Sequence, residues 1–236
     1  MSTSVKVAAL IPAAGSGQRL GQGPKAFVEV SGKTLLERAI TNFAEHVDEI
    51  VVAVPTELQT KAKNLLPDDV IITTGGTTRQ ETVYRLLQTC TAELVLIHDA
   101  ARPFLAADII KRTKAAVLAR GAASVVMPVA DSLIEATTGQ THDRSKLRAV
   151  QTPQGFRQNL ILRAHDVANA RGAQVTDDAS LVRALGEPVA LVEGSSWLLK
   201  VTDPSQLELA RALAPHWDAQ QDQATLTSQL KPSSML

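Results

Sequence analysis

The chain has 236 residues, 44% of them hydrophobic, so it can bury one large core and is expected to form a single α/β domain. Its 24 Lys and Arg residues balance 24 Asp and Glu residues, and only 3% of the residues are aromatic, which argues against nucleic acid as a partner. A single cysteine, Cys90, and the lack of a signal peptide or of an apolar run of about 20 residues predict a cytoplasmic protein without a membrane span.

Short apolar runs rich in β-branched residues alternate with helical patterns along most of the chain. This alternation is typical of a mostly parallel sheet with crossover helices on both faces. The predicted strands are Val5–Ile11, Glu49–Val54, Val70–Thr73, Glu93–His98, Ser124–Pro128 and Val189–Val192.

Helix start signals lie between these strands. A Ser, Thr or Asp that precedes an apolar stripe caps the first turn, and a proline at the first helical position strengthens the signal. Helices are expected to begin near Thr34, Thr56, Thr77-Thr78 and Asp203-Pro204, and to cover Gln158–Arg171 and Asp178–Leu185.

The alternation of strands and helices is interrupted between Asp131 and Gln151. Two extended pieces, Ser132–Ala136 and Lys146–Gln151, flank the polar linker Thr137–Ser145, and we interpret them as a protruding β-hairpin arm. An isolated two-stranded hairpin is only marginally stable in water. We therefore expect this arm to lie against a second copy of the chain in a homodimer.

The C-terminal residues 219–236 are rich in Gln, Ser and Thr and have little apolar surface to bury. We expect a disordered tail there, which leaves one folded domain over residues 1–218. Leu198–Val201 has the pattern of a short apolar strand, and Lys200 within it would need a partner.

A glycine-rich segment with two basic residues follows the first strand. Gly15 and Gly17 allow a tight turn that brings backbone N–H groups against an anion, and Arg19 and Lys25 add positive charge. A dinucleotide fingerprint would have Gly or Ala where this chain has Leu20, and no Gly-Lys-Ser/Thr follows as in a Walker loop. The segment predicts a phosphate-binding loop of another kind, with a plain glycine turn as the alternative.

Other distinctive residues follow later strands, at the sheet edge where α/β proteins bind ligands. Gly75 and Gly76 follow the third strand, and Asp99 follows the fourth. A carboxylate at the end of a buried strand costs free energy unless it is solvated, paired or bound to a cation. Pairing with Arg102 is the structural alternative to a role in binding, and we expect His98 to make a structural hydrogen bond.

Several motifs, in their order and spacing, resemble the 2-C-methyl-D-erythritol 4-phosphate cytidylyltransferase family of the non-mevalonate isoprenoid pathway. The resemblance runs from about Val5 to Leu213. It implies a Rossmann-like nucleotidyltransferase domain that transfers CMP from CTP to 2-C-methyl-D-erythritol 4-phosphate, releases pyrophosphate, uses Mg²⁺ and forms a homodimer. The motifs are Pro12-Ala-Ala-Gly-Ser-Gly-Gln-Arg19, Pro24-Lys25, Gly75-Gly76, Arg79, His98-Asp-Ala-Ala-Arg-Pro103, Thr176-Asp177 and Lys200-Val-Thr202.

The resemblance also implies roles for individual residues. The nucleotide would be bound by Pro12, Ala13, Ala14, Gly15, Ser16, Gly17, Gly75, Gly76, Arg79, Thr82 and Asp99. The acceptor would be bound by Asp99, Arg102, Asp131, Ser132, Arg144, Thr176 and Lys200, with Arg144 reaching across the dimer. The catalytic residues would be Arg19, Lys25, Arg144 and Lys200. Mg²⁺ would be held mainly through the CTP phosphates, with Asp99 as a candidate ligand.

Two departures from the family pattern concern the acceptor pocket. Ala130 stands where some members have a basic residue, and Leu198 stands where Asn is common. Other functions therefore stay open at this point. A ribitol-5-phosphate cytidylyltransferase would share the nucleotide motifs, and a sugar-nucleotide or molybdopterin nucleotidyltransferase is a more distant alternative. The non-enzyme alternative is an inactive regulatory subunit of the same fold, against which the presence of Arg19, Lys25 and Asp99 argues.

Overall fold

The centre of the molecule is a seven-stranded sheet in the order β11-β7-β10-β6-β1-β4-β5. The structure, a computed structural model, describes residues 5–15, 17 and 20–229. Neighbouring strands are parallel except for β10, which runs antiparallel to both β7 and β6, so the mostly parallel sheet is confirmed. The strands are β1 (Val7–Pro12), β4 (Glu49–Val54), β5 (Ile71–Thr74), β6 (Leu94–Ile97), β7 (Ala122–Pro128), β10 (Arg148–Arg157) and β11 (Ala190–Glu193).

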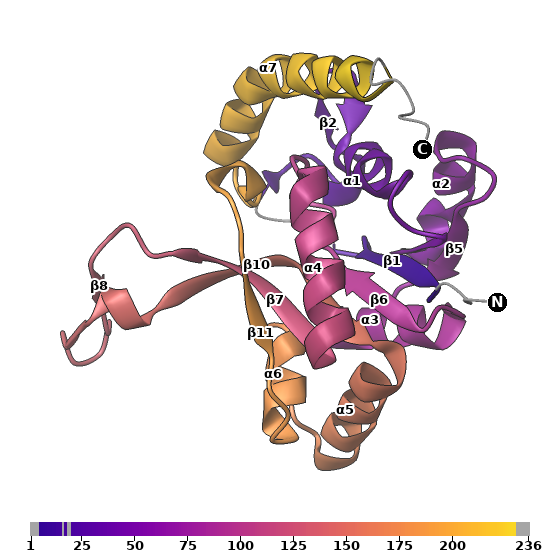
Figure 1. Cartoon of the computed structure of the whole chain (residues 1–236). Helices are drawn as coiled ribbons and strands as arrows, with labels where there is room; N and C mark the ends of the chain where they lie inside the picture. Colours follow the sequence, from indigo (N-terminus) through magenta and orange to yellow (C-terminus); the bar gives the residue numbers. More distant parts are fainter. Residues whose placement is uncertain (1–4, 16, 18–19, 230–236) are drawn as a thin grey trace, which may run out of the picture.

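Helices cover both faces of this sheet (Figure 1). Side chains of α1, α2 and α4 form one buried cluster with the sheet, and side chains of α3, α5 and α6 form another. α7 lies outside these layers, where Leu207 and Trp217 pack with Leu20, Val30 and Val201. The helices are α1 (Leu35–Phe43), α2 (Gln59–Leu65), α3 (Arg79–Thr89), α4 (Ala107–Arg120), α5 (Gln158–Arg171), α6 (Asp178–Ala184) and α7 (Pro204–Gln229).

Side-chain caps begin several of these helices at the predicted signals. Thr34 forms a capping box with Glu37 at the start of α1, Thr78 caps α3, and Asp203 accepts a backbone hydrogen bond from the first turn of α7. Such oxygens satisfy N–H groups that have no partner within the helix. The cap at Thr78 places Arg79 at the first position of α3. The shorter elements are β2 (Glu29–Val30), β3 (Lys33–Thr34), η2 (Lys25–Phe27), η3 (Thr56–Leu58), η4 (Arg144–Lys146) and η5 (Ser196–Leu198).

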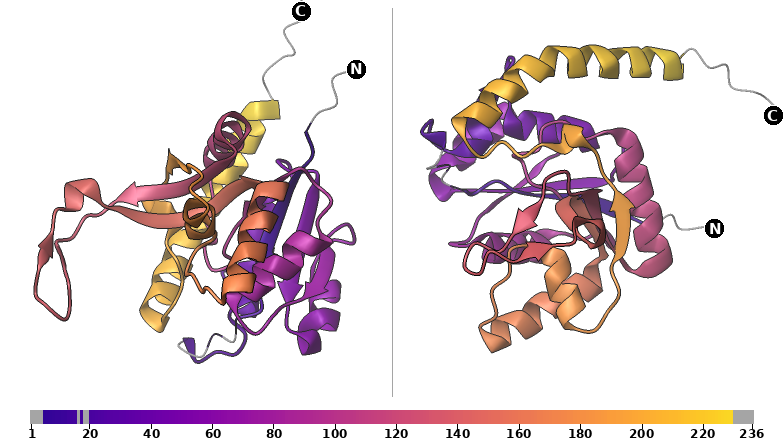
Figure 2. Two further views of the ribbon diagram at one scale, coloured as in Figure 1. Left: turned by 90° about the horizontal axis from the view of Figure 1, so that it is seen from below. Right: turned by 90° about the vertical axis from the view of Figure 1, so that its left-hand side faces the viewer.

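The arm projects from the body of the molecule (Figures 1 and 2), but its pairing differs from the predicted hairpin. At its tip β8 (Leu133–Ile134) pairs with β9 (Thr141–His142). The expected second piece, Lys146–Gln151, instead leads into β10 and pairs with β7 of the central sheet. The predicted pairing is wrong because β10 continues through Pro153, a residue that normally interrupts a strand. The register of the β10–β7 ladder shifts between Val150 and Gln154, the stretch that contains Pro153.

Two further segments differ from the sequence prediction. α7 continues to Gln229, so residues 219–229 are helical where a disordered tail was expected. This part of the chain contains good helix formers such as Ala and Gln. Their helix propensity outweighs the low number of large apolar residues. Leu198–Val201 is not a strand, because η5 ends at Leu198 and irregular backbone carries Lys200.

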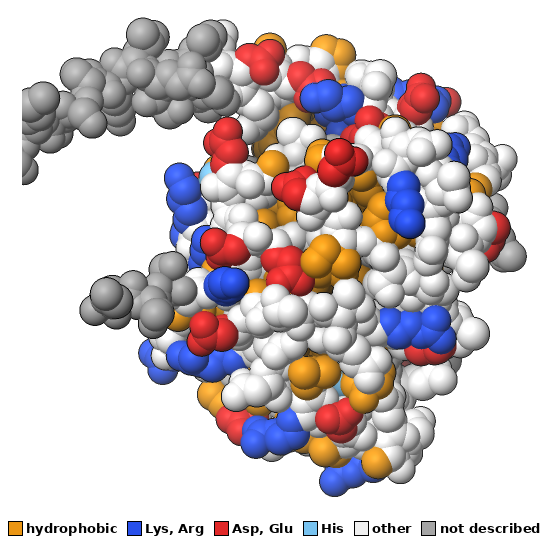
Figure 3. Space-filling model, turned by 90° about the vertical axis from the view of Figure 1, so that its right-hand side faces the viewer, with side chains coloured by type: hydrophobic (Ala, Val, Ile, Leu, Met, Phe, Trp, Pro, Cys, Tyr) orange, Lys and Arg blue, Asp and Glu red, His pale blue; other side chains and the backbone are white. Residues whose placement is uncertain are grey.

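The described surface agrees with the balanced composition. On the face drawn in Figure 3, basic and acidic side chains are interspersed. Among the described residues, no helix has the length and apolar character that crossing a membrane requires.

Candidate active site

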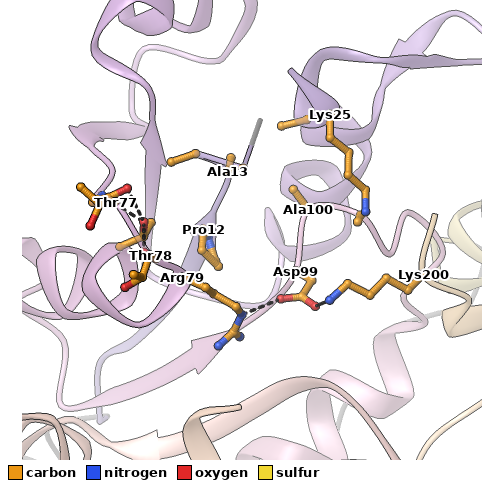
Figure 4. Close-up of a pocket in the computed structure, with 15 residues that line it drawn as sticks. Pro12, Ala13, Lys25, Thr77, Thr78, Arg79, Asp99, Ala100 and Lys200 are labelled. Atoms are coloured by element: carbon orange, nitrogen blue, oxygen red, sulfur yellow. Dashed lines mark hydrogen bonds and ion pairs between the residues drawn. The ribbon is translucent and has the colours of Figure 1, made fainter. Parts of the chain in front are cut away.

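A cavity of about 430 Å³ opens where β1, β5 and β6 end (Figure 4). This is the edge at which parallel α/β sheets bind ligands. Many of the predicted site residues line it together, and Ser16 and Arg19 lie outside the described residues. The lining consists of Pro12, Ala13, Ala14, Gly15, Lys25, Ala26, Gly76, Thr77, Thr78, Arg79, Thr82, Asp99, Ala100, Ala101 and Lys200.

The glycine loop turns sharply behind this cavity. Gly17 has a φ of +66°, and a Cβ on it would lie 2.6 Å from the carbonyl oxygen of Gly23 and 2.8 Å from the backbone nitrogen of Lys25. Only glycine fits such a close approach of two backbone segments. Gly17 thereby lets the chain fold back, and Lys25, at the start of η2, lines the cavity opposite Arg79 (Figure 4).

The loop after β5 packs closely against the end of β1. A Cβ on Gly75 would collide with the Cβ of Ala14, so Gly75 is needed for the loop to lie against the end of β1. The backbone N–H of Gly76 donates to Thr82 Oγ1 over 3.0 Å, and that hydroxyl donates to the carbonyl of Thr78 over 2.8 Å. Thr82 thus ties the glycines to the first turn of α3, and the edge of the cavity consists of backbone and short side chains.

Asp99 is the centre of the charged group in the cavity. Its carboxylate lies 3.3 Å from Arg79 Nε and 2.7 Å from Lys200 Nζ (Figure 4). Burial alone would raise the pKa of Asp99, but Arg79 and Lys200 outweigh burial and hold the pKa of this carboxyl well below its usual range. Asp99 is therefore an ionised, cation-paired group and not a proton acceptor.

Arg79 contacts a second carboxylate behind the cavity. Its Nη1 lies 2.8 Å from Oδ2 of Asp178, a residue of α6 that is buried and does not line the cavity. Burial would lower the pKa of Arg79, but Asp178 and Asp99 together raise it above the usual value. Arg79 is therefore ion-paired with two carboxylates and is not a solvated arginine at the start of a helix. Sequence analysis missed Asp178, because an Asp at a helix start is usually exposed.

His98 and Arg102 are buried, and their hydrogen bonds fix the segments beside them. The carbonyl of Arg102 lies 3.0 Å from His98 Nε2, and Thr152 Oγ1 lies 3.0 Å from His98 Nδ1. Burial lowers the pKa of His98 to about 4, so the ring is neutral and makes structural hydrogen bonds, as expected. Arg102 is not among the described ion-pair partners of Asp99 and instead donates to the carbonyls of Leu198 and Val150. It thereby fixes the segment that leads to Lys200.

The remaining predicted acceptor residues do not line the cavity of their own chain. Asp131, Ser132 and Arg144 are exposed on the arm, where Arg144 donates to the carbonyl of Ala130. Thr176 is exposed just before Asp177, the cap of α6. Sequence analysis also missed the lining residues Ala26, Thr77, Thr78, Ala100 and Ala101, although Thr78 carried a helix-cap signal.

The IspD family model, described as 2-C-methyl-D-erythritol 4-phosphate cytidylyltransferase, matches residues 7–215. The chain belongs to this family. A 2-C-methyl-D-erythritol 4-phosphate cytidylyltransferase of Deinococcus radiodurans is 51% identical to it over 220 residues, which are 92% of this chain and 93% of that protein. The protein of the same name from Thermus thermophilus is 45% identical over 218 residues, which are 91% of this chain and 100% of that protein.

A solved structure agrees with the family assignment. The crystal structure of the Thermus thermophilus enzyme has a TM-score of 0.79 and 42% sequence identity to this chain, and the match covers 90% of this chain and 100% of the other. The resemblance and the nucleotidyltransferase fold expected from the sequence are thus confirmed, and the chain is placed among the cytidylyltransferases.

Proposed function

We propose that this chain transfers CMP from CTP to 2-C-methyl-D-erythritol 4-phosphate and releases pyrophosphate. A phosphate oxygen of the acceptor attacks the α-phosphorus of CTP, and the bond from that phosphorus to the leaving pyrophosphate breaks. The observation that carries this proposal is that one cavity is lined by the glycine loop, Lys25, Arg79, Asp99 and Lys200. The chain also belongs to a family of this activity.

The chemistry of the cavity suits such a displacement. The acceptor phosphate has a second pKa of about 6, so it is largely ionised at neutral pH and needs no general base. In agreement, Asp99 is paired with two cations, and His98 is neutral and occupied by structural hydrogen bonds. The site must chiefly stabilise negative charge, for which we assign Lys25, Arg19 and Lys200.

We assign the cytosine to the slot at the edge of the cavity beside Ala14 and Gly76, where the loop after β5 packs on the end of β1. Close packing of Gly75 on Ala14 leaves a narrow edge of backbone groups there. Backbone N–H and C=O groups can pair with the edge of a pyrimidine, whereas a purine needs more room. Thr82 supports this slot through its hydrogen bond with Gly76.

The residues of the cavity fit Mg²⁺ held mainly by the nucleotide. Asp99 is the one carboxylate among the described lining residues, and the described part of the chain has no cluster of three or more His, Cys, Asp or Glu residues that could hold a metal. Mg²⁺ is commonly bound by one or two carboxylates together with substrate phosphates and water. When bound, the ion would neutralise part of the triphosphate charge, and Asp99 would supply the protein ligand.

A homodimer through the arm would complete the acceptor pocket. Leu133, Ile134 and Val150 on the arm are 39%, 66% and 41% exposed, which is apolar surface suited to burial against a second copy. Arg144, Asp131 and Ser132 of one copy would then face the acceptor phosphate in the other, with Thr176 nearby and Lys200 and Arg102 of that other copy on the opposite side.

The experiment that tests the function is pyrophosphate release with each of the four common nucleoside triphosphates against a panel of polyol phosphates. The expected result is turnover with CTP and 2-C-methyl-D-erythritol 4-phosphate, with 4-diphosphocytidyl-2-C-methyl-D-erythritol identified by mass. Faster turnover with ribitol 5-phosphate would overturn the proposed acceptor. No turnover with any pair would favour an inactive subunit.

A further inference from the structure

We infer that Asp178 is a positioning residue for this reaction, because it holds the Arg79 guanidinium in the orientation that contacts Asp99 at the edge of the nucleotide site. The inference rests on the proposed function. Asp178 does not line the cavity, so it acts through Arg79 and not on the substrate.

A chain of ion pairs runs from behind the sheet into the cavity. Lys200 contacts one oxygen of Asp99, Arg79 Nε contacts the other, and Arg79 Nη1 contacts Asp178. The two carboxylates lie against different nitrogens of one planar guanidinium: Arg79 Nε donates to Asp99, and Arg79 Nη1 forms an ion pair with Asp178 outside hydrogen-bond geometry. Two anions at different edges of the group restrict both its direction and its rotation. A single partner would fix the direction only.

Asp178 is itself held rigidly. Its side chain is 1% exposed, and its backbone N–H donates to Gln154 Oε1 over 2.9 Å at the start of α6. The buried ring of His165 lies beside it, with Nε2 3.6 Å from Asp178 Oδ1. Gln154 belongs to β10, so the central sheet fixes the backbone at the start of α6 from which the Asp178 carboxylate projects.

Loss of the Asp178 charge would change the active site without removing any group that lines it. Arg79, with a side chain that is 31% exposed, would keep Asp99 as its partner but could rotate toward the bound nucleotide. The pairing of Asp99 with Lys200 would change as well, because the positive charge on its other side would move. Displacement of a catalytic group by about 1 Å can cost about a hundredfold in rate.

The test is a double-mutant cycle of Asp178→Asn and Arg79→Ala, measured as kcat and KM for CTP and for the acceptor. We expect Asp178→Asn to lower kcat/KM for CTP by about ten- to a hundredfold and to raise the KM for CTP more than that for the acceptor. In the Arg79→Ala background the same substitution should have no further effect. Equal losses in the two backgrounds would overturn the inference, because they would indicate a general structural role.

A matched control is Asp166→Asn, which removes an exposed carboxylate of α5 that contacts Tyr84 and should leave the kinetics unchanged. If Asp178→Asn does not fold, Arg79→Lys provides the test, because a lysine keeps the charge but cannot span two carboxylates. It should show a similar loss, and full activity of Arg79→Lys would contradict the inference.

One readout does not depend on catalysis. The NMR resonance of the Arg79 Nε–H group, assigned by its loss in Arg79→Lys, should shift and exchange faster with water in Asp178→Asn. An unchanged resonance would overturn the inference. A wild-type protein without turnover would overturn the proposed function instead, and the resonance would still test the role of Asp178.

Discussion

Lys200 Nζ lies 2.7 Å from Asp99 Oδ2, so an irregular segment before α7 supplies a cation to the carboxylate that ends β6. The ion pair joins residues about a hundred positions apart in the chain and brings the assigned nucleotide and acceptor sides of the cavity together. Its main electrostatic effect is to keep Asp99 ionised, since Lys200 and Arg79 together outweigh the cost of its burial.

This pairing leads to a prediction about the pH profile. Because the pKa of Asp99 is well below its usual range, the carboxylate stays ionised from about pH 5 to 8. The acidic limb of kcat/KM should therefore come from the acceptor phosphate, whose second pKa is about 6. Asp99→Asn should lower the rate across the profile but leave that limb in place. A limb that disappears in Asp99→Asn would contradict the prediction.

Lys25→Ala and Arg19→Ala should each lower kcat by about 10²- to 10³-fold, because each removes positive charge from a group that gains negative charge in the transition state. Steady-state kinetics at saturating CTP measure this effect. Thermal unfolding should be little changed, and Lys33→Ala, an exposed lysine of β3, is the matched control. Activity within a few-fold of the parent would contradict the assigned roles.

The chain should use CTP in preference to ATP and GTP, because the slot beside Ala14 is narrow. Gly75→Ala tests the cause, since a methyl group there collides with Ala14 and must widen or block the slot. We expect kcat/KM for CTP to fall mainly through a higher KM. Comparable kcat/KM for a purine nucleotide in the wild type would show that this slot does not select the base.

The sequence could predict those parts of the site that depend on local chemistry. The glycines of the phosphate loop, the caps of α1 and α3, and Asp99 at the end of a buried strand all carry signals in a few adjacent residues. In the structure, Lys25, Arg79 and Asp99 meet in one cavity because the parallel strands that precede them end at one edge of the sheet.

What the sequence could not predict depends on tertiary contacts. β10 contains Pro153 and Gly155, and only its pairing with both β6 and β7 makes that segment a strand. Asp178 has the signature of an ordinary helix start, and its role emerges only because the fold places its carboxylate against Arg79. Likewise, Lys200 gains its partner through the fold and not through a local strand.

The stability of the protein should depend on His98 in mildly acidic solution. Burial lowers the pKa of His98 from 6.5 to about 4, so between these values the unfolded state binds a proton that the folded state does not. The free energy of unfolding should therefore fall as the pH decreases through this window, by up to about 1.4 kcal/mol per pH unit. When the free energy of unfolding is measured with urea at several pH values, it should change less steeply with pH in His98→Gln than in the wild type. His142→Gln, on the exposed arm, should keep the pH dependence of the wild type. Equal slopes in the wild type and His98→Gln would contradict the prediction.

The last prediction concerns Arg144, which is exposed on the arm and does not line the cavity of its own chain. If it completes the site of a second copy, a mixed dimer of Arg144→Ala and Lys25→Ala subunits collects both defects in the same site. One site then carries both defects and the other carries neither. Two nearly inactive proteins should regain about a quarter of the wild-type activity when co-expressed in equal amounts, because about half of the dimers are mixed and each has one intact site of two.

The complementation is measured as the rate of pyrophosphate release after co-expression, with each single variant co-expressed with itself as the control. Mass spectrometry of the intact dimers must show that mixed species have formed. Recovery of activity would establish that Arg144 acts across the dimer. No recovery in the presence of mixed dimers would mean that Arg144 serves its own chain or has no role, and the proposed shared site would be wrong.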